Sequence, residues 1–199
     1  MRPSLYFSFA VVRGCRALLL SMLIFAVGGA ATASPITYIF TGTGSGTVNG
    51  NSFNGTFTIT DVADTSGVTS GGGEYRNAPS SSVFASGALT ASLTSPLVIE
   101  NTISPGFMGF SESVTPFNDE SLTNSVFETY GLNTALPQTS GGLSVSTGAL
   151  GTFPTTSGVL VFNSITALSF QATTTPEPAT LTFAGLGLAG LLLLRRRCR

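Results

Sequence analysis

The sequence predicts an all-β domain, a single antiparallel β-sandwich or jelly-roll-like fold of roughly eight to ten short strands. Apolar residues recur at every second position in several short runs, and Gly, Asn-Gly and Ser/Thr turn signals separate these runs. Between residues 34 and 171, no stretch keeps the apolar spacing of an amphipathic helix for three turns. The alternate positions are largely Thr and Ser, which is typical of antiparallel sheets with one solvated face.

The first half of this domain contains the clearest hairpin. Ile36, Tyr38 and Phe40 share one face of the opening strand, and Asn49-Gly50 then precedes a second alternating run at 53–60. The next segment, 61–78, is rich in turn residues and is expected to be an exposed loop. Further strands are expected at 83–85, 88–94 and 97–103.

The second half is less regular. The polar segment 111–124 is expected to hold one short helical turn near Asp119 and Glu120. Strands are expected on both sides of it, at 107–110, 126–130, 143–145, 158–163 and 165–170. The predicted extracytoplasmic domain is therefore 34–171, and a Thr-rich linker, 172–175, follows it.

Residues 1–33 have the organisation of a secretory signal peptide. Three arginines lie at or before the start of a short apolar run, 17–27, and Ala31 and Ala33 then form a small-residue cleavage pattern. We expect cleavage after Ala33. An uncleaved anchor is the alternative, and the short apolar run argues against it.

The last segment, 176–199, combines a short motif, an apolar run and a basic cluster: Pro176-Glu177-Pro178, then 179–194, then Arg195, Arg196 and Arg197. The 16-residue run is slightly short for a membrane-spanning helix, for which about 17–25 residues are typical, but flanking arginines extend its reach. The arginines act as a cytoplasmic stop-transfer signal. We therefore predict one C-terminal transmembrane helix.

In this order, the three features resemble the PEP-CTERM sorting signal of Gram-negative bacteria. The resemblance covers only the tail, and it implies recognition and processing by exosortase, a membrane-embedded cysteine protease. It further implies an exported, inner-membrane-anchored precursor that is delivered to the cell surface or the extracellular matrix. It implies nothing about the activity of the domain at 34–171.

The composition of the exported part excludes several kinds of chemistry. The chain has no His, and both cysteines lie in the terminal segments, so a Ser-His-Asp triad, a Cys nucleophile and a His/Cys zinc site are excluded there. Residues 34–175 contain one basic residue, Arg76, and eight acidic residues, so this part of the chain has a net charge of −7. That charge argues against nucleic acid as a partner. We expect a non-catalytic surface or matrix protein without a cofactor.

Carboxylates are the remaining candidates for chemistry. Asp61 with Asp64, or Asp119 with Glu120, are weak candidate calcium ligands, since neither pair has the alternating oxygen ligands of an EF-hand loop. Three readings stay open for these acids: solvated loop residues, a calcium-assisted module that binds extracellular polysaccharide, and a carboxylate glycosidase. The tyrosines are interpreted as core or edge residues rather than as a sugar-stacking platform: Tyr38, Tyr75 and Tyr130.

Overall fold

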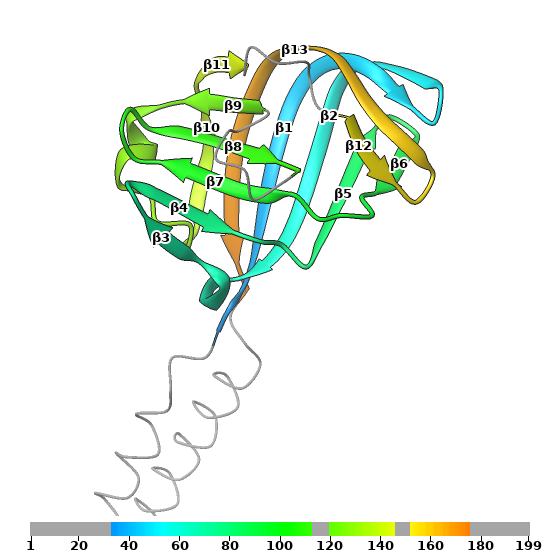
Figure 1. Cartoon of the computed structure of the whole chain (residues 1–199). Coiled ribbons are helices and arrows are strands. Elements are labelled where there is room, and N and C mark those ends of the chain that lie inside the picture. Colours follow the sequence, from blue (N-terminus) through cyan, green and yellow to red (C-terminus); the bar gives the residue numbers. More distant parts are fainter. Residues whose placement is uncertain (1–32, 113–119, 146–151, 176–199) are drawn as a thin grey trace, which may run out of the picture. The chain divides into compact units, whose positions relative to one another are not determined.

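The computed structural model describes residues 33–112, 120–145 and 152–175, all within one compact unit, Ala33–Glu177. In these residues, thirteen strands form two antiparallel sheets (Figure 1). The predicted all-β class is confirmed. Residues 1–32 of the predicted signal peptide and 176–199, with the predicted sorting signal and transmembrane helix, lie outside the described residues, as does Asp119. Within the described ranges, no helix has the length and apolar character needed to cross a membrane.

The larger sheet places the first and last strands side by side at its centre. Its order is β10-β13-β1-β2-β5-β6, and β12 pairs with another part of β13. The strands are β1 (Pro35–Val48), β2 (Asn51–Asp64), β5 (Ser81–Ser86), β6 (Leu89–Ser92), β10 (Leu136–Ser140), β12 (Thr152–Thr155) and β13 (Gly158–Thr174). β1 pairs with β2 along its whole length and with β13 on its other side.

The smaller sheet packs against one half of the larger sheet. Its order is β11-β9-β8-β7-β4-β3. The strands are β3 (Thr69–Gly71), β4 (Glu74–Asn77), β7 (Val98–Thr102), β8 (Phe107–Ser111), β9 (Glu120–Thr123) and β11 (Gly142–Val145), with short 3-10 helices η1 (Thr65–Gly67) and η2 (Ser125–Thr129). Three of the six strand pairings in the larger sheet and three of the five in the smaller sheet join strands that are consecutive along the chain.

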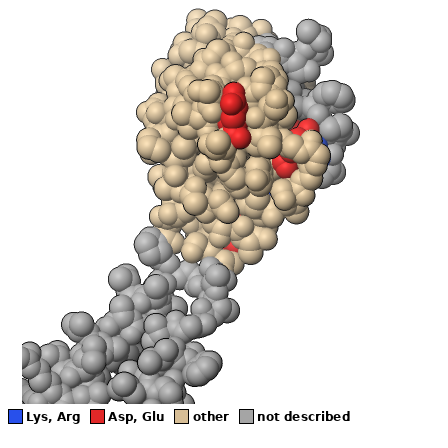
Figure 2. All heavy atoms as spheres, turned by 90° about the vertical axis from the view of Figure 1, so that its left-hand side faces the viewer, with Lys and Arg blue, Asp and Glu red and all other residues tan. Residues whose placement is uncertain are grey.

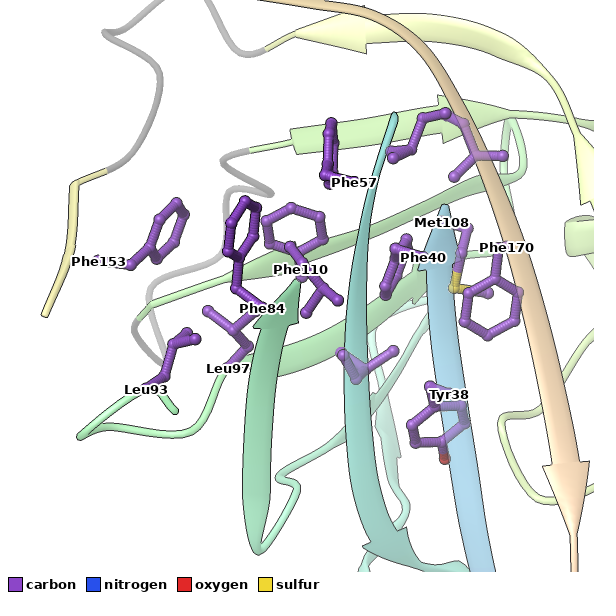
Figure 3. Close-up of a cluster of buried hydrophobic side chains, with 14 of the residues drawn as sticks. Tyr38, Phe40, Phe57, Phe84, Leu93, Leu97, Met108, Phe110, Phe153 and Phe170 are labelled. Carbon is purple, nitrogen blue, oxygen red and sulfur yellow. The ribbon is translucent and has the colours of Figure 1, made fainter. Parts of the chain in front are cut away.

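One apolar core fills the space between the sheets (Figure 3). Phe40 of β1 meets Phe110 of β8 with ring centroids 5.0 Å apart, which joins the two sheets. The larger sheet also curls, so that its β6 end approaches β12. An isolated bridge between Leu93, which follows β6, and Thr155 of β12 marks this approach. Phenylalanines fill this curled half: Phe53, Phe57, Phe84, Phe153 and Phe162. The inward alternation predicted for the first strand is confirmed, since Ile36, Tyr38 and Phe40 are fully buried.

The prediction that 61–78 is an exposed loop is wrong for 61–64, 69–71 and 74–77, which are strand. β2 continues to Asp64 because Asp61 and Ala63 keep the inward alternation of the preceding residues. The glycines do mark a turn: Gly72 and Gly73 have φ of +63° and +84° and connect β3 to β4. The turn signal was therefore correct, but it lies inside a hairpin rather than a long loop.

Four predictions about the second half are also corrected. Residues 125–129 form η2 rather than a strand, because the Asn124 side chain accepts from the N–H of Val126 and starts a turn. Glu120 begins β9 instead of lying in a helical turn. The two strands predicted at 158–170 are one strand, β13, whose two register shifts against β1 accommodate the irregular pattern. The predicted linker 172–175 is strand through Thr174.

Candidate functional site

The two ends of the domain meet at one end of the larger sheet (Figure 1). Ile36 of β1 lies opposite Thr174 of β13, and the N–H of Thr175 donates to the carbonyl of Pro35 at 3.1 Å. Ser34 is also fixed, since its N–H donates to Oγ1 of Thr65 at 3.1 Å. The first residue after the predicted signal-peptide cleavage and the last residue before the sorting tail are therefore both hydrogen-bonded into the fold.

The β1–β13 pairing extends to Thr174 because the apolar core continues beneath these strand ends. Ala172 of β13 is 1% exposed and lies opposite the fully buried Tyr38 of β1. The edge strand β10 covers the other side of β13, with Leu136 opposite Ala172. Thr173 and Thr174 are exposed, and β-branched residues favour the extended backbone that the last pairs need. The sheet thus ends immediately before the Pro-Glu-Pro sequence.

Asp61 is a carboxyl group inside the core. It is 0% exposed on the inward face of β2, between Tyr38 of β1 and Ser82 of β5 in the strand register. No hydrogen bond reaches either carboxyl oxygen from the described residues. Burial raises the pKa of Asp61 from 3.8 to about 7, and the neighbouring Ser82 hydroxyl only partly offsets this rise. Asp61 is therefore a neutral acid in the folded domain below about pH 7.

Buried tyrosine and asparagine side chains hold the segment 127–132, between η2 and β10, onto the core. The Tyr38 hydroxyl donates to the carbonyl of Leu132 at 2.6 Å and accepts from Nδ2 of Asn77 at 2.7 Å. Asn101 Nδ2 donates to the carbonyls of Phe127 and Tyr130. Burial raises the pKa of Tyr38 to about 12, so its hydroxyl stays protonated at neutral pH.

The core interpretation of the tyrosines is confirmed for Tyr38 and Tyr130, which are 0% and 5% exposed. Tyr75 is partly buried and packs against the same core. Burial also raises the pKa of Tyr130, whose hydroxyl donates to the carbonyl of Thr134 at 2.8 Å. These rings stabilise the domain and do not form an exposed platform for sugars.

Arg76 joins two carboxylates on the outward face of the smaller sheet. Its Nη2 lies 2.9 Å from Oε2 of Glu74, and its Nε lies 3.4 Å from Oε1 of Glu100. The Glu100 side chain is 5% exposed, whereas the Glu74 side chain is 31% exposed. The one basic residue of the exported domain therefore neutralises a nearly buried acid, which is a structural role.

The structure does not bring the candidate calcium ligands of β2 together. Asp61 faces the core, whereas Asp64 is exposed and caps η1, accepting from the N–H and the hydroxyl of Ser66 at 2.7 Å each. Glu120 begins β9, and its predicted partner Asp119 lies outside the described residues. Across the described ranges, no three His, Cys, Asp or Glu side chains are grouped so that they could hold a metal ion.

Two shallow grooves lie on the surface of the larger sheet. The first has a volume of about 400 Å³ and is lined mainly by hydroxyl and small residues: Thr41, Gly42, Thr43, Thr56, Ser140, Gly141, Leu143, Thr166, Ala167, Leu168 and Ser169. The second, of about 480 Å³, lies near the start of β2 and the β5–β6 turn. None of the residues that line these two grooves is charged.

Two of the described acids share a basic partner, because Glu74 and Glu100 both contact Arg76. Figure 2 shows one acidic side chain surrounded by uncharged residues and, at the edge of the view, an acidic group beside a basic side chain. Sequence reasoning treated Asp61 as a loop acid and missed its burial. Its two-residue spacing from Phe57 and Ile59 was the signal that places it inside the sheet.

Comparison with known proteins identifies the tail. Residues 174–197 match the family model described as the PEP-CTERM protein-sorting motif. No match to the chain was found among curated proteins or among solved structures. The resemblance stated from the sequence is therefore confirmed for the tail, and that match begins at the last residue of β13. The motif implies an exported protein with a membrane-anchored precursor that exosortase processes.

Proposed function

We propose that this PEP-CTERM motif protein is a non-catalytic component of the cell surface or extracellular matrix, delivered there after exosortase removes its tail. The observation that carries the proposal is the motif match at 174–197, whose first residue, Thr174, is the last residue of β13. The chain would enter the export pathway through its signal peptide. The apolar run at 179–194 would then anchor the precursor, with Arg195–Arg197 on the cytoplasmic side.

The environment of the acids supports a non-catalytic role. A carboxylate glycosidase needs two acids that face one substrate, about 5–10 Å apart. Asp61 faces the core, Asp64 caps a turn, and Glu100 is neutralised by Arg76. Asp61, Asp64 and Glu100 are thus each used within the fold.

A truncation after Thr175 tests the proposal, because it keeps all of β13. In a host that carries exosortase, we expect the full chain to reach the surface and the truncated chain to pass into the medium without a membrane-bound stage. A full-length variant with Pro176→Ala and Pro178→Ala is the matched control, and it should insert in the membrane but remain unprocessed. Surface delivery of the truncated chain at the full-length level would refute the proposal.

A second candidate function is carbohydrate binding, in the form of a module for extracellular polysaccharide. The hydroxyl-lined groove of about 400 Å³ favours it, because hydroxyl groups can donate and accept hydrogen bonds with a neutral polyol. A calcium-assisted form would also use the acids Asp119 and Glu120. A glycan array with and without chelator tests both forms, and a Thr41→Val/Thr43→Val variant tests the groove. Absence of binding in both conditions would eliminate this candidate.

A further inference from the structure

The hydroxyl-lined groove of about 400 Å³ crosses the outward face of the larger sheet. Its lining residues come from four neighbouring strands, in the order β10, β13, β1 and β2 (Figure 1), and Leu143 is added from β11. In the strand register, Ser169 of β13 lies opposite Thr41 of β1. Thr43 of β1 lies opposite Thr56 of β2. Because neighbouring strands lie about 4.8 Å apart, the groove extends roughly 14 Å across the strands, which suits a segment of a polymer.

The hydroxyl groups of the groove differ between its two sides. On β13, the Ser169 hydroxyl donates to the carbonyl of Thr41 at 3.1 Å. The Thr166 hydroxyl donates to the carbonyl of Thr43 at 3.2 Å. On β1 and β2, no hydrogen bond among the described residues involves the hydroxyls of Thr41, Thr43 or Thr56. Thr43 and Thr56 are exposed and Thr41 is half-buried, so these three hydroxyls are available to a ligand.

The described lining of the groove is uncharged, and so is most of the sheet around it. The seven strands of the larger sheet contain two charged residues, Asp61 and Asp64. Asp61 faces the core. Asp64 ends β2, eight residues after Thr56, which corresponds to roughly 25 Å of strand. The described residues of the groove therefore offer no counter-charge to an ionic ligand and no carboxylate to a calcium ion.

Apolar groups accompany the hydroxyls in the lining. Leu143, Ala167, Leu168 and the threonine methyl groups supply them. Leu143 packs against the core, so its position is fixed by the fold. A sugar ring has a similar mixture, with hydroxyl groups at its rim and C–H groups on its faces. Threonine hydroxyls both donate and accept hydrogen bonds, so they can pair with sugar hydroxyls in either direction.

We propose that this groove binds a segment of a linear, uncharged polysaccharide that lies across the strands, and that this binding needs no calcium. The inference rests on the second candidate function, carbohydrate binding, and is independent of processing by exosortase. The polysaccharide runs between β10 and β2 and pairs its hydroxyls with those of Thr41, Thr43 and Thr56. The strand spacing of about 4.8 Å is close to the length of one sugar ring in an extended chain, so successive rings lie over successive strands.

Surface plasmon resonance with the full chain in detergent tests the inference, because it does not depend on removal of the tail. The immobilised probes are three neutral polymers, pullulan, glucomannan and mixed-linkage β-glucan, and the anionic polymer hyaluronan. We expect binding to at least one neutral polymer, with equal affinity in calcium and in EDTA, and weaker or no binding to hyaluronan. Binding that EDTA abolishes, or a preference for hyaluronan, would overturn the inference and leave carbohydrate binding in place. Binding to none of the polymers would remove both, whereas the proposed surface role is judged separately by processing.

Two matched double variants locate the binding site. Thr43→Val with Thr56→Val removes two hydroxyls that lie opposite each other and keeps the size of both side chains, so affinity should fall several-fold. The control, Thr90→Val with Thr152→Val, changes exposed residues of β6 and β12 that do not line the groove, and it should bind like the wild type. Circular dichroism and thermal unfolding check that both variants fold. Equal affinities of the two variants would contradict the assignment of binding to this groove.

Discussion

Replacing Asp61 by Asn should remove most of the pH dependence of the domain's stability between pH 4 and pH 7. Asp61 is fully buried, and burial raises its pKa from 3.8 to about 7, an effect that the neighbouring Ser82 hydroxyl only partly offsets. In this window the folded state keeps the proton and the unfolded state loses it. Stability therefore falls as pH rises, and it levels off above about pH 7.

The size of the effect follows from the shift in pKa. A rise from 3.8 to about 7 corresponds to about 4 kcal/mol, at about 1.4 kcal/mol per unit. Such a loss is a large share of the roughly 5–15 kcal/mol that stabilises a typical domain. For a domain of this size it lowers the melting temperature by on the order of 10 °C.

Urea unfolding of residues 34–175 at pH 4.5, 6 and 8 measures this difference. We expect the wild type to lose stability across the series relative to Asp61→Asn, whose side chain cannot ionise. Glu128→Gln, which changes an exposed acid, is the control and should follow the wild type. Parallel pH profiles for the wild type and Asp61→Asn would refute the reasoning, because they would show that the folded domain does not hold this proton.

Two further pairs of substitutions test the ion pair and the packing. Arg76→Leu removes the cation beside the nearly buried Glu100 and should cost about 3 kcal/mol in urea unfolding. Glu74→Gln, at the more exposed partner, should cost less than about 1 kcal/mol, and equal costs would contradict the assigned roles. Gly44→Ala would place its Cβ 2.2 Å from a backbone carbonyl oxygen of β13, which predicts a loss of about 1–3 kcal/mol. Gly71→Ala meets no atom within 4 Å, so thermal unfolding should separate the two glycine variants.

The sequence was most informative where alternation and turn chemistry agree. Asn49-Gly50 separates two strands with a clear inward face, and the structure has the β1–β2 hairpin there. Both residues adopt the positive φ that such a turn requires. The tail was identified for a different reason, because its motif, apolar run and arginines are contiguous in sequence and need no tertiary contact to be recognised.

The sequence was less informative where tertiary contacts override local signals. β10 and β12 contain Pro137 and Pro154, and proline inside a run argues against a strand unless the strand lies at an edge. The run at 126–130 has strand-like residues, but the Asn124 cap turns it into η2. The burial of Asp61 also contradicts the usual surface position of acids, so the two-residue period was a better guide than residue type.

The end of the larger sheet shows where prediction from local sequence failed. The residues 172–175 are mostly Thr and precede a proline-rich motif, which suggested a linker. Only the β1–β13 pairing, which joins residues far apart in sequence, reveals that 172–174 are strand.

The most direct test of the account compares the full chain in otherwise identical cells with and without exosortase. Membrane and surface fractions are separated, and the intact mass of the protein is measured in each. We predict a surface product that begins at Ser34 and lacks the Arg-rich tail in cells with exosortase, and a membrane-bound product that retains the tail in cells without it. The same tail-free surface product in both strains would contradict the account.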